Sequence, residues 1–338
     1  MGNIKDYAIA TIGSHSALQI LKGAKDEGIK TICICKKGAE KIYKQFNVAD
    51  ELIVLDNFDN FEKLEDELIS KNAIIIPHGS FISYLGTNRV QNLRVMHFGT
   101  KEILEWESNR NMERVWLKKA GLRLPKIFNT PDEIDTKVII KFHGASGGFG
   151  YFIAHTAEEF YERIKGYKGK EDYVIQEYII GVPLYLHYFY SPLTDEVEIM
   201  SFDKRYESNA DSIGRIAAKD QLDVDLKTSY TVTGNMPLVV RESLLPEILE
   251  MGENVVRTSK ELVKGGLFGP FCLETILDPN LNFYVFEISA RIVAGTNPFI
   301  NGTPYTWVRY NEPMSTGRRI AREIKNAIMS DRVEEVLG

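Results

Sequence analysis

The sequence predicts a mixed fold, in which an α/β domain built on a parallel sheet precedes an α+β region. Segments typical of strands and helices alternate through the first hundred residues, which indicates a parallel sheet covered by helices. From about residue 137 onward, strand-like segments predominate and favour a mostly antiparallel sheet. The chain has 338 residues, more than one hydrophobic core usually serves, so two or three domains are expected.

The amino-terminal segments have clear local signatures. Residues 7–13 (YAIATIG) predict a strand, and residues 14–28 predict an amphipathic helix that ends at Gly28. A further helix is expected at 61–71, and further strands at 31–35, 51–55, 73–77 and 94–99. Because ligands bind at the carboxyl ends of parallel strands, the loops at 13–16 and 77–80 are candidate binding loops.

The rest of the chain contains a predicted domain joint and a second set of strands and helices. Residues 101–120 predict a helix, and the GLRLPK segment that follows is a domain joint. Thr156 and Glu159 form a predicted capping box at the start of a helix. Strands are expected at 137–142, 151–156, 173–179, 184–190, 197–203, 269–277 and 282–289, and helices at 156–167, 242–262 and 317–329. We therefore expect three domains, at 1–122, 123–203 and 204–338.

Composition restricts the classes of function. The net charge is -6, and no long basic run is present, which argues against nucleic-acid binding as the main activity. No apolar stretch reaches the length of a membrane span, and the amino terminus does not have the layout of a signal peptide. Three cysteines are too few for a disulfide framework, so buried free thiols are expected. These features predict a cytoplasmic protein that binds neither nucleic acid nor membrane.

A glycine-rich run, Gly144 to Gly150, lies between two predicted strands. It lacks the Gly-Lys-Ser/Thr ending of a Walker loop, and no helix follows it, as a dinucleotide fingerprint would require. The remaining interpretation is a hairpin flap whose N–H groups contact phosphates. Lys141 at the base of the flap would supply a cation. The alternative is a glycine hairpin that serves only as a turn.

Two glutamates interrupt apolar strands later in the chain. Glu274 and Glu287 lie on strands predicted to pair, which would place both carboxylates on one face. Converging carboxylates repel each other unless a cation lies between them, and Mg²⁺ bound by carboxylates and nucleotide phosphates is a common solution. The alternative is that each glutamate forms a salt bridge with a nearby Arg or Lys.

Lys141, the glycine flap, the QEYIIG segment (176–181), Glu274 and the EISAR segment (287–291) together resemble the ATP-grasp superfamily over residues 100–320. The resemblance implies an amino-terminal pre-ATP-grasp domain, then a small lid subdomain and a large subdomain. It also implies ATP, Mg²⁺ (or Mn²⁺) at Glu274 and Glu287, and a catalytic Arg291 and Lys141. The implied ATP contacts are Lys141, Gly144, Ser146, Gly147 and Gly148, together with Gln176, Glu177, Tyr178 and Ile179 as the hinge that lines adenine. Ser289 replaces the usual Asn of the metal strand, and a Lys often found near residue 112 is absent.

The segments IGSHSALQILKGAKDEG, IIIPHGSFISYLG, TVTGNMPLVVRESLLP and STGRRIAREI resemble the archaeal-type, formate-dependent FAICAR synthetase family of purine (IMP) biosynthesis. That family joins formate to AICAR, the aminoimidazole carboxamide ribonucleotide, using ATP and no folate. The resemblance implies a formyl phosphate intermediate and a homo-oligomer, trimeric or hexameric. It further implies AICAR contacts at His15, Ser80 and Asn235 and an ATP contact at Glu207. His78 receives no role, and Ala294 to Pro298 is a weak candidate for contact with formate or phosphate.

Two alternatives to this synthetase stay open at this point. One is a related ATP-grasp ligase that uses another acid or amine, and the other is a non-catalytic nucleotide-binding regulator. The presence of His15, Ser80 and Asn235 favours the synthetase, and the presence of Glu274 and Glu287 disfavours the regulator. A dehydrogenase is disfavoured because the loop at 13–16 lacks spaced glycines.

Overall fold

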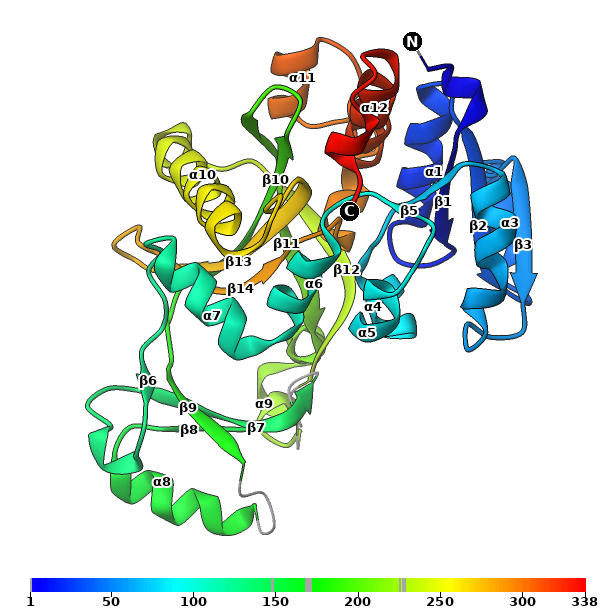
Figure 1. Cartoon of the computed structure of the whole chain (residues 1–338). Helices are drawn as coiled ribbons and strands as arrows, with labels where there is room; N and C mark the ends of the chain where they lie inside the picture. Colours follow the sequence, from blue (N-terminus) through cyan, green and yellow to red (C-terminus); the bar gives the residue numbers. More distant parts are fainter. Residues whose placement is uncertain (1, 147–148, 168–171, 225, 227–228) are drawn as a thin grey trace.

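The computed structural model describes residues 2–146, 149–167, 172–224, 226 and 229–338, without side-chain detail at 143–146, 149–150 and 230. Its strands form one parallel sheet and two antiparallel sheets (Figure 1). The mixed α/β and α+β architecture predicted from the sequence is therefore confirmed.

The amino-terminal sheet has the strand order β3-β2-β1-β4-β5, and all its pairs are parallel. Its strands are β1 (Ala8–Ile12), β2 (Lys30–Lys36), β3 (Glu51–Leu55), β4 (Ala73–Ile75) and β5 (Met96–His97). The accompanying helices are α1 (Ala17–Asp26), α2 (Glu40–Phe46), α3 (Glu65–Ser70), α4 (Gly79–Leu85) and α5 (Thr87–Gln91). The predicted strand and helix alternation is confirmed, and Gly28 follows α1 with a positive φ of 77°.

The small sheet has the order β6-β9-β7-β8 and is covered by α8 (Ala157–Arg163). Its strands are β6 (Ile127–Phe128), β7 (Val138–Ser146), β8 (Phe149–Ala154) and β9 (Tyr173–Glu177). The Thr156 hydroxyl accepts from the Glu159 N–H at 3.2 Å, as predicted. However, the Glu159 carboxylate accepts from the His155 N–H at 2.9 Å, so the reciprocal half of the predicted capping box shifts by one residue.

The large antiparallel sheet has the order β12-β11-β10-β13-β14. Its strands are β10 (Val182–Ser191), β11 (Glu196–Ser208), β12 (Tyr230–Leu238), β13 (Gly269–Leu277) and β14 (Phe283–Ser289). The expected boundary between residues 203 and 204 falls inside β11, and β10 and β11 belong to this sheet. The chain crosses between the two sheets at Gly181, where an added Cβ would collide with the Leu277 carbonyl.

Two local predictions for this half of the chain need correction. The helix expected at 101–120 is two helices, α6 (Lys101–Ser108) and α7 (Arg110–Lys119). Asn109 separates them, and its side chain caps α7 by accepting from the Asn111 and Met112 N–H groups. The stretch before residue 242 contains β12, an edge strand that is not among the strands expected from the sequence. Its sequence, YTVTGNMPL, lacks the buried apolar alternation by which a strand is identified.

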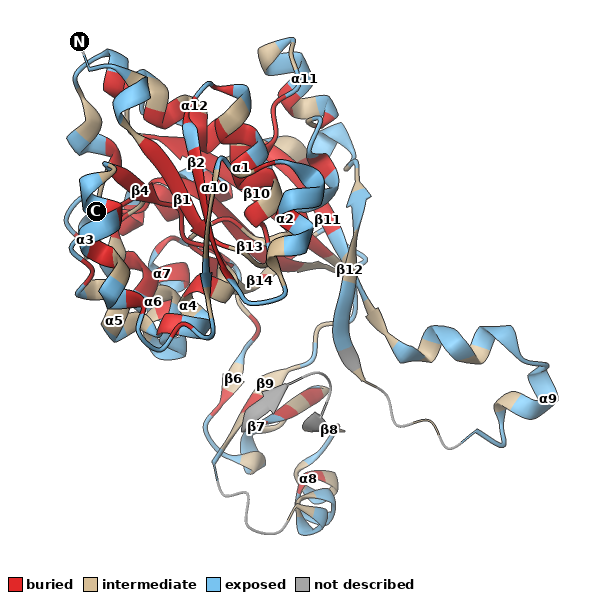
Figure 2. Cartoon of the chain, turned by 90° about the vertical axis from the view of Figure 1, so that its right-hand side faces the viewer, coloured by how far each residue is buried: buried red, intermediate tan, exposed pale blue. Residues whose placement is uncertain are grey.

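The remaining helices lie in the second half of the chain. They are α9 (Ala218–Gln221), α10 (Leu245–Leu262), α11 (Pro304–Tyr310) and α12 (Thr316–Met329), with a 3-10 helix, η7, at Ala294–Phe299. Buried residues concentrate in the parallel sheet and in β10 and β13, whereas β12 and α9 project from the body and are mostly exposed (Figure 2). None of the helices in the described part of the chain combines the length and apolarity needed to cross a membrane.

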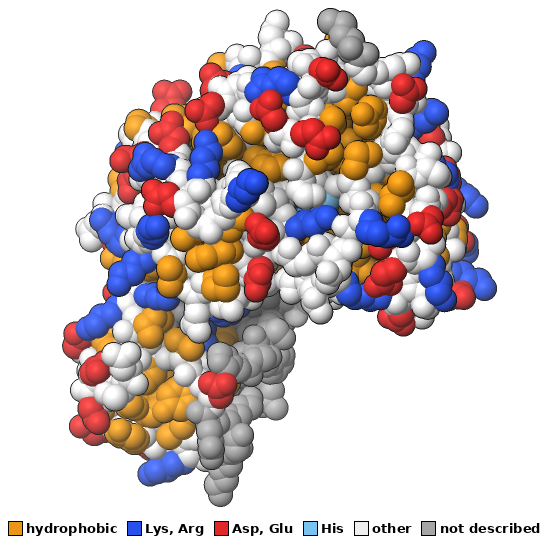
Figure 3. All heavy atoms as spheres, viewed as in Figure 1, with side chains coloured by type: hydrophobic (Ala, Val, Ile, Leu, Met, Phe, Trp, Pro, Cys, Tyr) orange, Lys and Arg blue, Asp and Glu red, His pale blue; other side chains and the backbone are white. Residues whose placement is uncertain are grey.

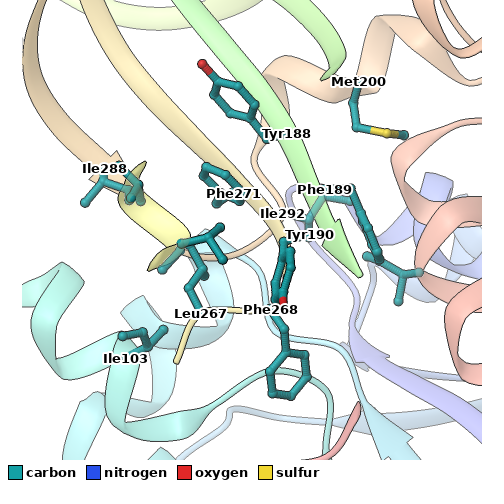
Figure 4. Close-up of a cluster of buried hydrophobic side chains, with 14 of the residues drawn as sticks. Ile103, Tyr188, Phe189, Tyr190, Met200, Leu267, Phe268, Phe271, Ile288 and Ile292 are labelled. Atoms are coloured by element: carbon teal, nitrogen blue, oxygen red, sulfur yellow. The ribbon is translucent and has the colours of Figure 1, made fainter. Parts of the chain in front are cut away.

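A continuous core joins the amino-terminal domain to the large sheet. Tyr188 stacks on Phe271 with ring centroids 4.8 Å apart, and this aromatic pair lies among the buried side chains of Figure 4. Helices α1 and α12 cross closely because Gly23 faces the α12 backbone and Gly317 faces the α1 backbone, each without space for a Cβ. This packing fixes the loop that precedes α1 relative to the large sheet. The three cysteines are free and buried, as expected.

Candidate functional site

The two loops singled out at the carboxyl ends of β1 and β4 meet. The Ser14 hydroxyl donates to the Ser80 hydroxyl at 3.1 Å. His15 adopts a left-handed conformation, with φ of 53°, and its ring stacks on His78 at a centroid distance of 5.3 Å. The predicted neighbourhood of these loops is therefore confirmed.

His78 has a structural role that the sequence analysis did not assign. Its Nε2–H donates to the Ile12 carbonyl at 2.8 Å, and its Nδ1 accepts from the Phe81 N–H at 3.3 Å. These partners require the neutral imidazole, and burial lowers the pKa of His78 to about 4. The fixed His78 ring is the platform on which His15 lies.

His15 and Arg291 approach each other across the boundary between the two sheets. A Cβ added to Gly79 would lie 2.9 Å from His15 Nε2 and 3.4 Å from the guanidinium carbon of Arg291. Surrounding atoms that limit hydration lower the pKa of His15, with smaller contributions from His78 and Arg291, although the residue keeps a solvent-accessible edge. The structure thus brings together a predicted nucleotide contact and the predicted catalytic arginine.

Arg291 is oriented by a glutamate that the sequence analysis missed. Glu107 on α6 forms an ion pair with Arg291 at 2.8 Å, and its other oxygen accepts from the Ala290 N–H at 2.9 Å. Burial raises the pKa of Glu107, and the Arg291 cation opposes that rise. The Arg291 Nε atom is buried and has no hydrogen-bond partner among the described residues.

Glu274 and Glu287 lie directly opposite each other on β13 and β14, as the strand alternation predicted. Glu274 is buried, and one of its oxygens pairs with Arg205, so part of the salt-bridge alternative also holds. Its other oxygen, Oε2, has no partner among the described residues. Burial and the neighbouring Glu287 raise the pKa of Glu274 to about 8. A buried carboxylate oxygen without a partner, next to a second carboxylate, suits a divalent cation.

The described residues contain no group of three or more His, Cys, Asp or Glu side chains arranged to hold a metal ion. The two carboxylates of Glu274 and Glu287 are therefore an incomplete shell, which oxygen atoms of a bound phosphate or water would have to complete.

Side chains of helix α7 contact β14, the strand that carries Glu287. The Ile288 N–H donates to Glu113 at 2.7 Å, and Arg110 lies 3.8 Å from Glu287. Burial raises the pKa of Glu113 to about 8. Because β14 is the edge of its sheet, these helix side chains take the place of a neighbouring strand. The charged segment ESNRNMERV contained this signal, but sequence spacing does not show which strand it faces.

Lys141 and Gln176 meet in the small sheet, where the Lys141 ammonium donates to the Gln176 side chain at 3.2 Å. Limited hydration lowers the pKa of Lys141, as does Arg110, while Glu287 opposes this change. Lys141 is therefore within electrostatic reach of the carboxylates on the large sheet, although it keeps contact with solvent.

The predicted adenine hinge is partly engaged in backbone contacts. The Glu177 carboxylate accepts from the Lys126 N–H at 2.9 Å, and the Tyr178 N–H donates to the Lys137 carbonyl at 2.8 Å. Tyr178 is exposed and Ile179 is half-buried. Of the flap residues, Gly144 and Ser146 lie in β7 and their surroundings are not described, while Gly147 and Gly148 lie outside the described residues.

Three remaining candidates lie around the same face of the large sheet. Glu207 is half-buried near Arg205, and limited hydration raises its pKa. Asn235 lies opposite Arg205 on β12, in a strand and not in the turn that an isolated TGN segment suggests. The 294–298 segment reaches the first loop, since the Asn297 side chain donates to the His15 carbonyl at 3.1 Å. Ser289 is buried opposite Cys272.

Comparisons with known proteins agree with this arrangement. Residues 9–128 match the model "Protein of unknown function (DUF1246)", and residues 156–338 match "Domain of unknown function (DUF1297)". The chain is 57% identical to the 5-formaminoimidazole-4-carboxamide-1-(beta)-D-ribofuranosyl 5'-monophosphate synthetase of Pyrococcus abyssi over 337 residues, 98% of each chain. It is 49% identical to the Methanocaldococcus jannaschii protein of the same name, over 99% of this chain and 96% of the relative.

Solved structures show the same fold. The IMP biosynthesis protein PurP of Thermococcus kodakaraensis matches with a TM-score of 0.78 and 31% identity, covering 98% of this chain and 100% of that chain. N5-carboxyaminoimidazole ribonucleotide synthetase of Thermotoga maritima matches with a TM-score of 0.60 and 17% identity, over 94% and 76% of the two chains. At 17% identity, the second match supports a shared fold and nothing further. This chain belongs to the 5-formaminoimidazole-4-carboxamide-1-(beta)-D-ribofuranosyl 5'-monophosphate synthetase family, on an ATP-grasp fold.

Proposed function

We propose that this protein is an ATP- and formate-dependent ligase that converts AICAR to FAICAR and releases ADP and phosphate. Membership of the synthetase family supports the reaction. The observation that carries the proposal is the convergence of His15 on Arg291 beside the facing carboxylates Glu274 and Glu287. This arrangement supports the proposal, because a ligase of this kind needs a nucleotide-binding loop, a cation and carboxylates suited to a divalent metal.

Formate is a poor electrophile because its carboxylate is anionic, so it must first be activated. In the first step, a formate oxygen attacks the γ-phosphorus of ATP, which forms formyl phosphate and releases ADP. In the second step, the 5-amino nitrogen of AICAR attacks the formyl carbon. Phosphate then leaves, and the nitrogen loses a proton. Both steps depend more on positioning and charge neutralisation than on a strong base.

The residues divide these tasks between the sheets. Glu274 and Glu287 would hold Mg²⁺ or Mn²⁺, which would supply positive charge to neutralise phosphate oxygens. Arg291, oriented by Glu107, stabilises the phosphoryl group in transfer. Lys141 binds ATP from the small sheet, which we assign as the lid that limits hydrolysis of formyl phosphate.

The remaining family assignments complete the proposal. The flap residues Gly144, Ser146, Gly147 and Gly148, the hinge residues Gln176, Glu177, Tyr178 and Ile179, and Glu207 contact ATP. His15, Ser80 and Asn235 contact AICAR. The face shown in Figure 3 carries Lys and Arg side chains interspersed with Asp and Glu, which suits small-molecule substrates more than a nucleic acid.

We further propose a cytoplasmic homo-oligomer, trimeric or hexameric as the family resemblance implies. Helix α11 supports this, because Trp307 and Val308 expose 51% and 86% of their surface. Light scattering of the purified protein measures the assembly, and a monomer at micromolar concentration would contradict it.

A coupled ADP-release assay tests the reaction. ATP, Mg²⁺, formate and AICAR are supplied together and then omitted one at a time, and the formylated product is identified by mass spectrometry. ADP release that requires both formate and AICAR supports the proposal, and Glu287→Gln should abolish it. Turnover with another acid or amine, but not with this pair, would retain the ligase class and reject the substrates. Tight ATP binding without turnover under any condition would indicate a regulator.

A further inference from the structure

A buried hydrogen-bonded chain of three side chains lies next to the site. His187 on β10 contacts Asp203 Oδ1 on β11 through Nε2 at 2.6 Å. Asn235 on β12 donates from Nδ2 to Asp203 Oδ2 at 2.7 Å. His187 and Asp203 are buried, with 2% and 1% of their surface exposed, whereas Asn235 is half-buried. The hydrogen bonds therefore lead from the buried His187 to Asn235, whose side chain is partly accessible to solvent.

The chemistry of the three groups sets the direction of every hydrogen bond. An ionised carboxylate only accepts, so His187 must present Nε2–H and Asn235 must present its –NH₂ group to Asp203. The oxygen and nitrogen of an amide are otherwise difficult to distinguish, but the Asp203 partner decides the orientation here. Asn235 Oδ1 is consequently on the side of the amide away from Asp203, where it is available as an acceptor.

Packing prevents this arrangement from relaxing. Gly295 in η7 lies against the pair so closely that an added Cβ would collide with the Asp203 carboxylate and lie 2.7 Å from His187. The same 3-10 helix is tied to the first loop, because Asn297 donates to the His15 carbonyl at 3.1 Å. These hydrogen-bonded side chains are therefore held against η7, which also anchors the predicted nucleotide loop.

The hydrogen-bonded network of His187, Asp203 and Asn235 lies next to the proposed substrate site. Asp203 and Glu274 lie opposite Tyr185 from its two sides, so these residues share one face of the large sheet. Asn235 lies opposite Arg205, which pairs with Glu274. Asn235 thus borders the metal and nucleotide region from the β12 side.

We propose that Asp203, held by His187, is a positioning residue that fixes Asn235 with Oδ1 toward the nucleotide substrate, where it accepts a hydrogen bond from the carboxamide –NH₂ of AICAR. This inference rests on the proposed function. Of the two donors on the imidazole ring, the 5-amino group is the nucleophile and must remain free to approach the formyl carbon, so the carboxamide –NH₂ is the ring donor that an acceptor can hold. The fixed polarity excludes the isosteric 4-carboxylate, which offers only acceptors.

The variant Asp203→Asn should reverse this polarity. His187 still donates, so the new amide places its oxygen toward His187 and its –NH₂ toward Asn235. Asn235 must then rotate its amide, which turns its own –NH₂ toward the substrate. We expect a preference for the carboxylate over the carboxamide, the opposite of the wild-type preference.

Equilibrium binding separates this inference from the proposed function. Calorimetry measures the Kd of AICAR and of its 4-carboxylate analogue for wild type, Asp203→Asn and a matched exposed control, Asp56→Asn. We expect wild type and the control to prefer AICAR by about 100-fold, and Asp203→Asn to lose or reverse that preference while its Kd for ATP stays within about twofold.

Equal wild-type affinity for the two nucleotides would overturn the inference, as would an unchanged preference in folded Asp203→Asn. If Asp203→Asn does not fold, Asn235→Ala takes its place, because this half-buried residue tolerates truncation and the preference for AICAR should fall toward unity. A preference retained in Asn235→Ala would also overturn the inference. Failure of the formylation assay, with the binding preference intact, would instead reject the proposed reaction.

Discussion

Glu274→Gln should stabilise the metal-free protein at pH 8 and change its stability little at pH 5. Burial and Glu287 raise the pKa of Glu274 to about 8, from an ordinary value of 4.5. A carboxyl group with a raised pKa stabilises the folded state fully below pH 4.5, and this stabilisation is lost as the pH rises through 8. The difference corresponds to about 5 kcal/mol for the fully ionised group, at about 1.4 kcal/mol per pKa unit.

The neutral amide avoids this penalty, and the raised pKa already includes the attraction between Glu274 and Arg205. At pH 5 the carboxyl of Glu274 is protonated, so its replacement by a neutral amide removes no charge from the site. We therefore expect the Glu274→Gln variant to gain about 4 kcal/mol at pH 8 and less than about 1 kcal/mol at pH 5. For a cooperative unit of 338 residues, a gain of about 4 kcal/mol raises Tm by about 6 °C.

Thermal unfolding followed by circular dichroism, in EDTA at pH 5 and pH 8, measures the change. Glu287→Gln is the companion variant, because it removes the neighbouring carboxylate that helps to raise the pKa of Glu274 and should therefore reduce the pH dependence of stability. Both variants should lose at least about 100-fold in kcat, since each removes a proposed metal ligand. A stability difference between Glu274→Gln and wild type that is the same at both pH values would refute the buried, raised-pKa carboxyl.

Gly79→Ala should weaken AICAR binding about 10–100-fold, because the new Cβ would lie 2.9 Å from His15 Nε2. Calorimetry checks this, and an unchanged Kd would show that the loop has room to move. Glu107→Ala should lower kcat about 10–100-fold, since it releases the guanidinium that it orients, while KM for ATP stays the same. Steady-state kinetics tests it against Glu105→Ala, an exposed change on the same helix, and equal kcat values would contradict the positioning role. Lys141→Met should raise the KM for ATP at least about tenfold without altering AICAR binding, and an unaffected KM would exclude Lys141 from the ATP site.

Local patterns were sufficient to predict the amino-terminal sheet and its binding edge. Apolar strands alternating with amphipathic helices allow few arrangements, and carboxyl ends of parallel strands share one edge. The contact between Ser14 and Ser80, 66 positions apart, follows from that rule. The pairing of Glu274 with Glu287 was predictable for a similar reason, because two adjacent strands joined by a short turn pair with each other.

Other elements had signals too weak for a sequence argument. Strand β12 is largely exposed and therefore lacks the apolar alternation that marks a buried strand. The break between α6 and α7 depends on one capping residue, Asn109, inside a polar segment that otherwise continues as helix. The crossing from the small sheet to the large one depends on the space around Gly181, which is a property of the packed structure.

Residue types and short-range periodicity therefore decided which segments become strands and helices, and they identified the facing carboxylates and the two loops that meet. Tertiary packing alone decided which of these groups meet. Glu107 reaches Ala290 across 183 positions, and Asn235 reaches Asp203 across neighbouring strands of a sheet whose edge strand was not predicted. Such contacts depend on where helices dock and which strand lies at an edge, because hydrogen bonds act over about 3 Å and chain spacing does not specify that distance.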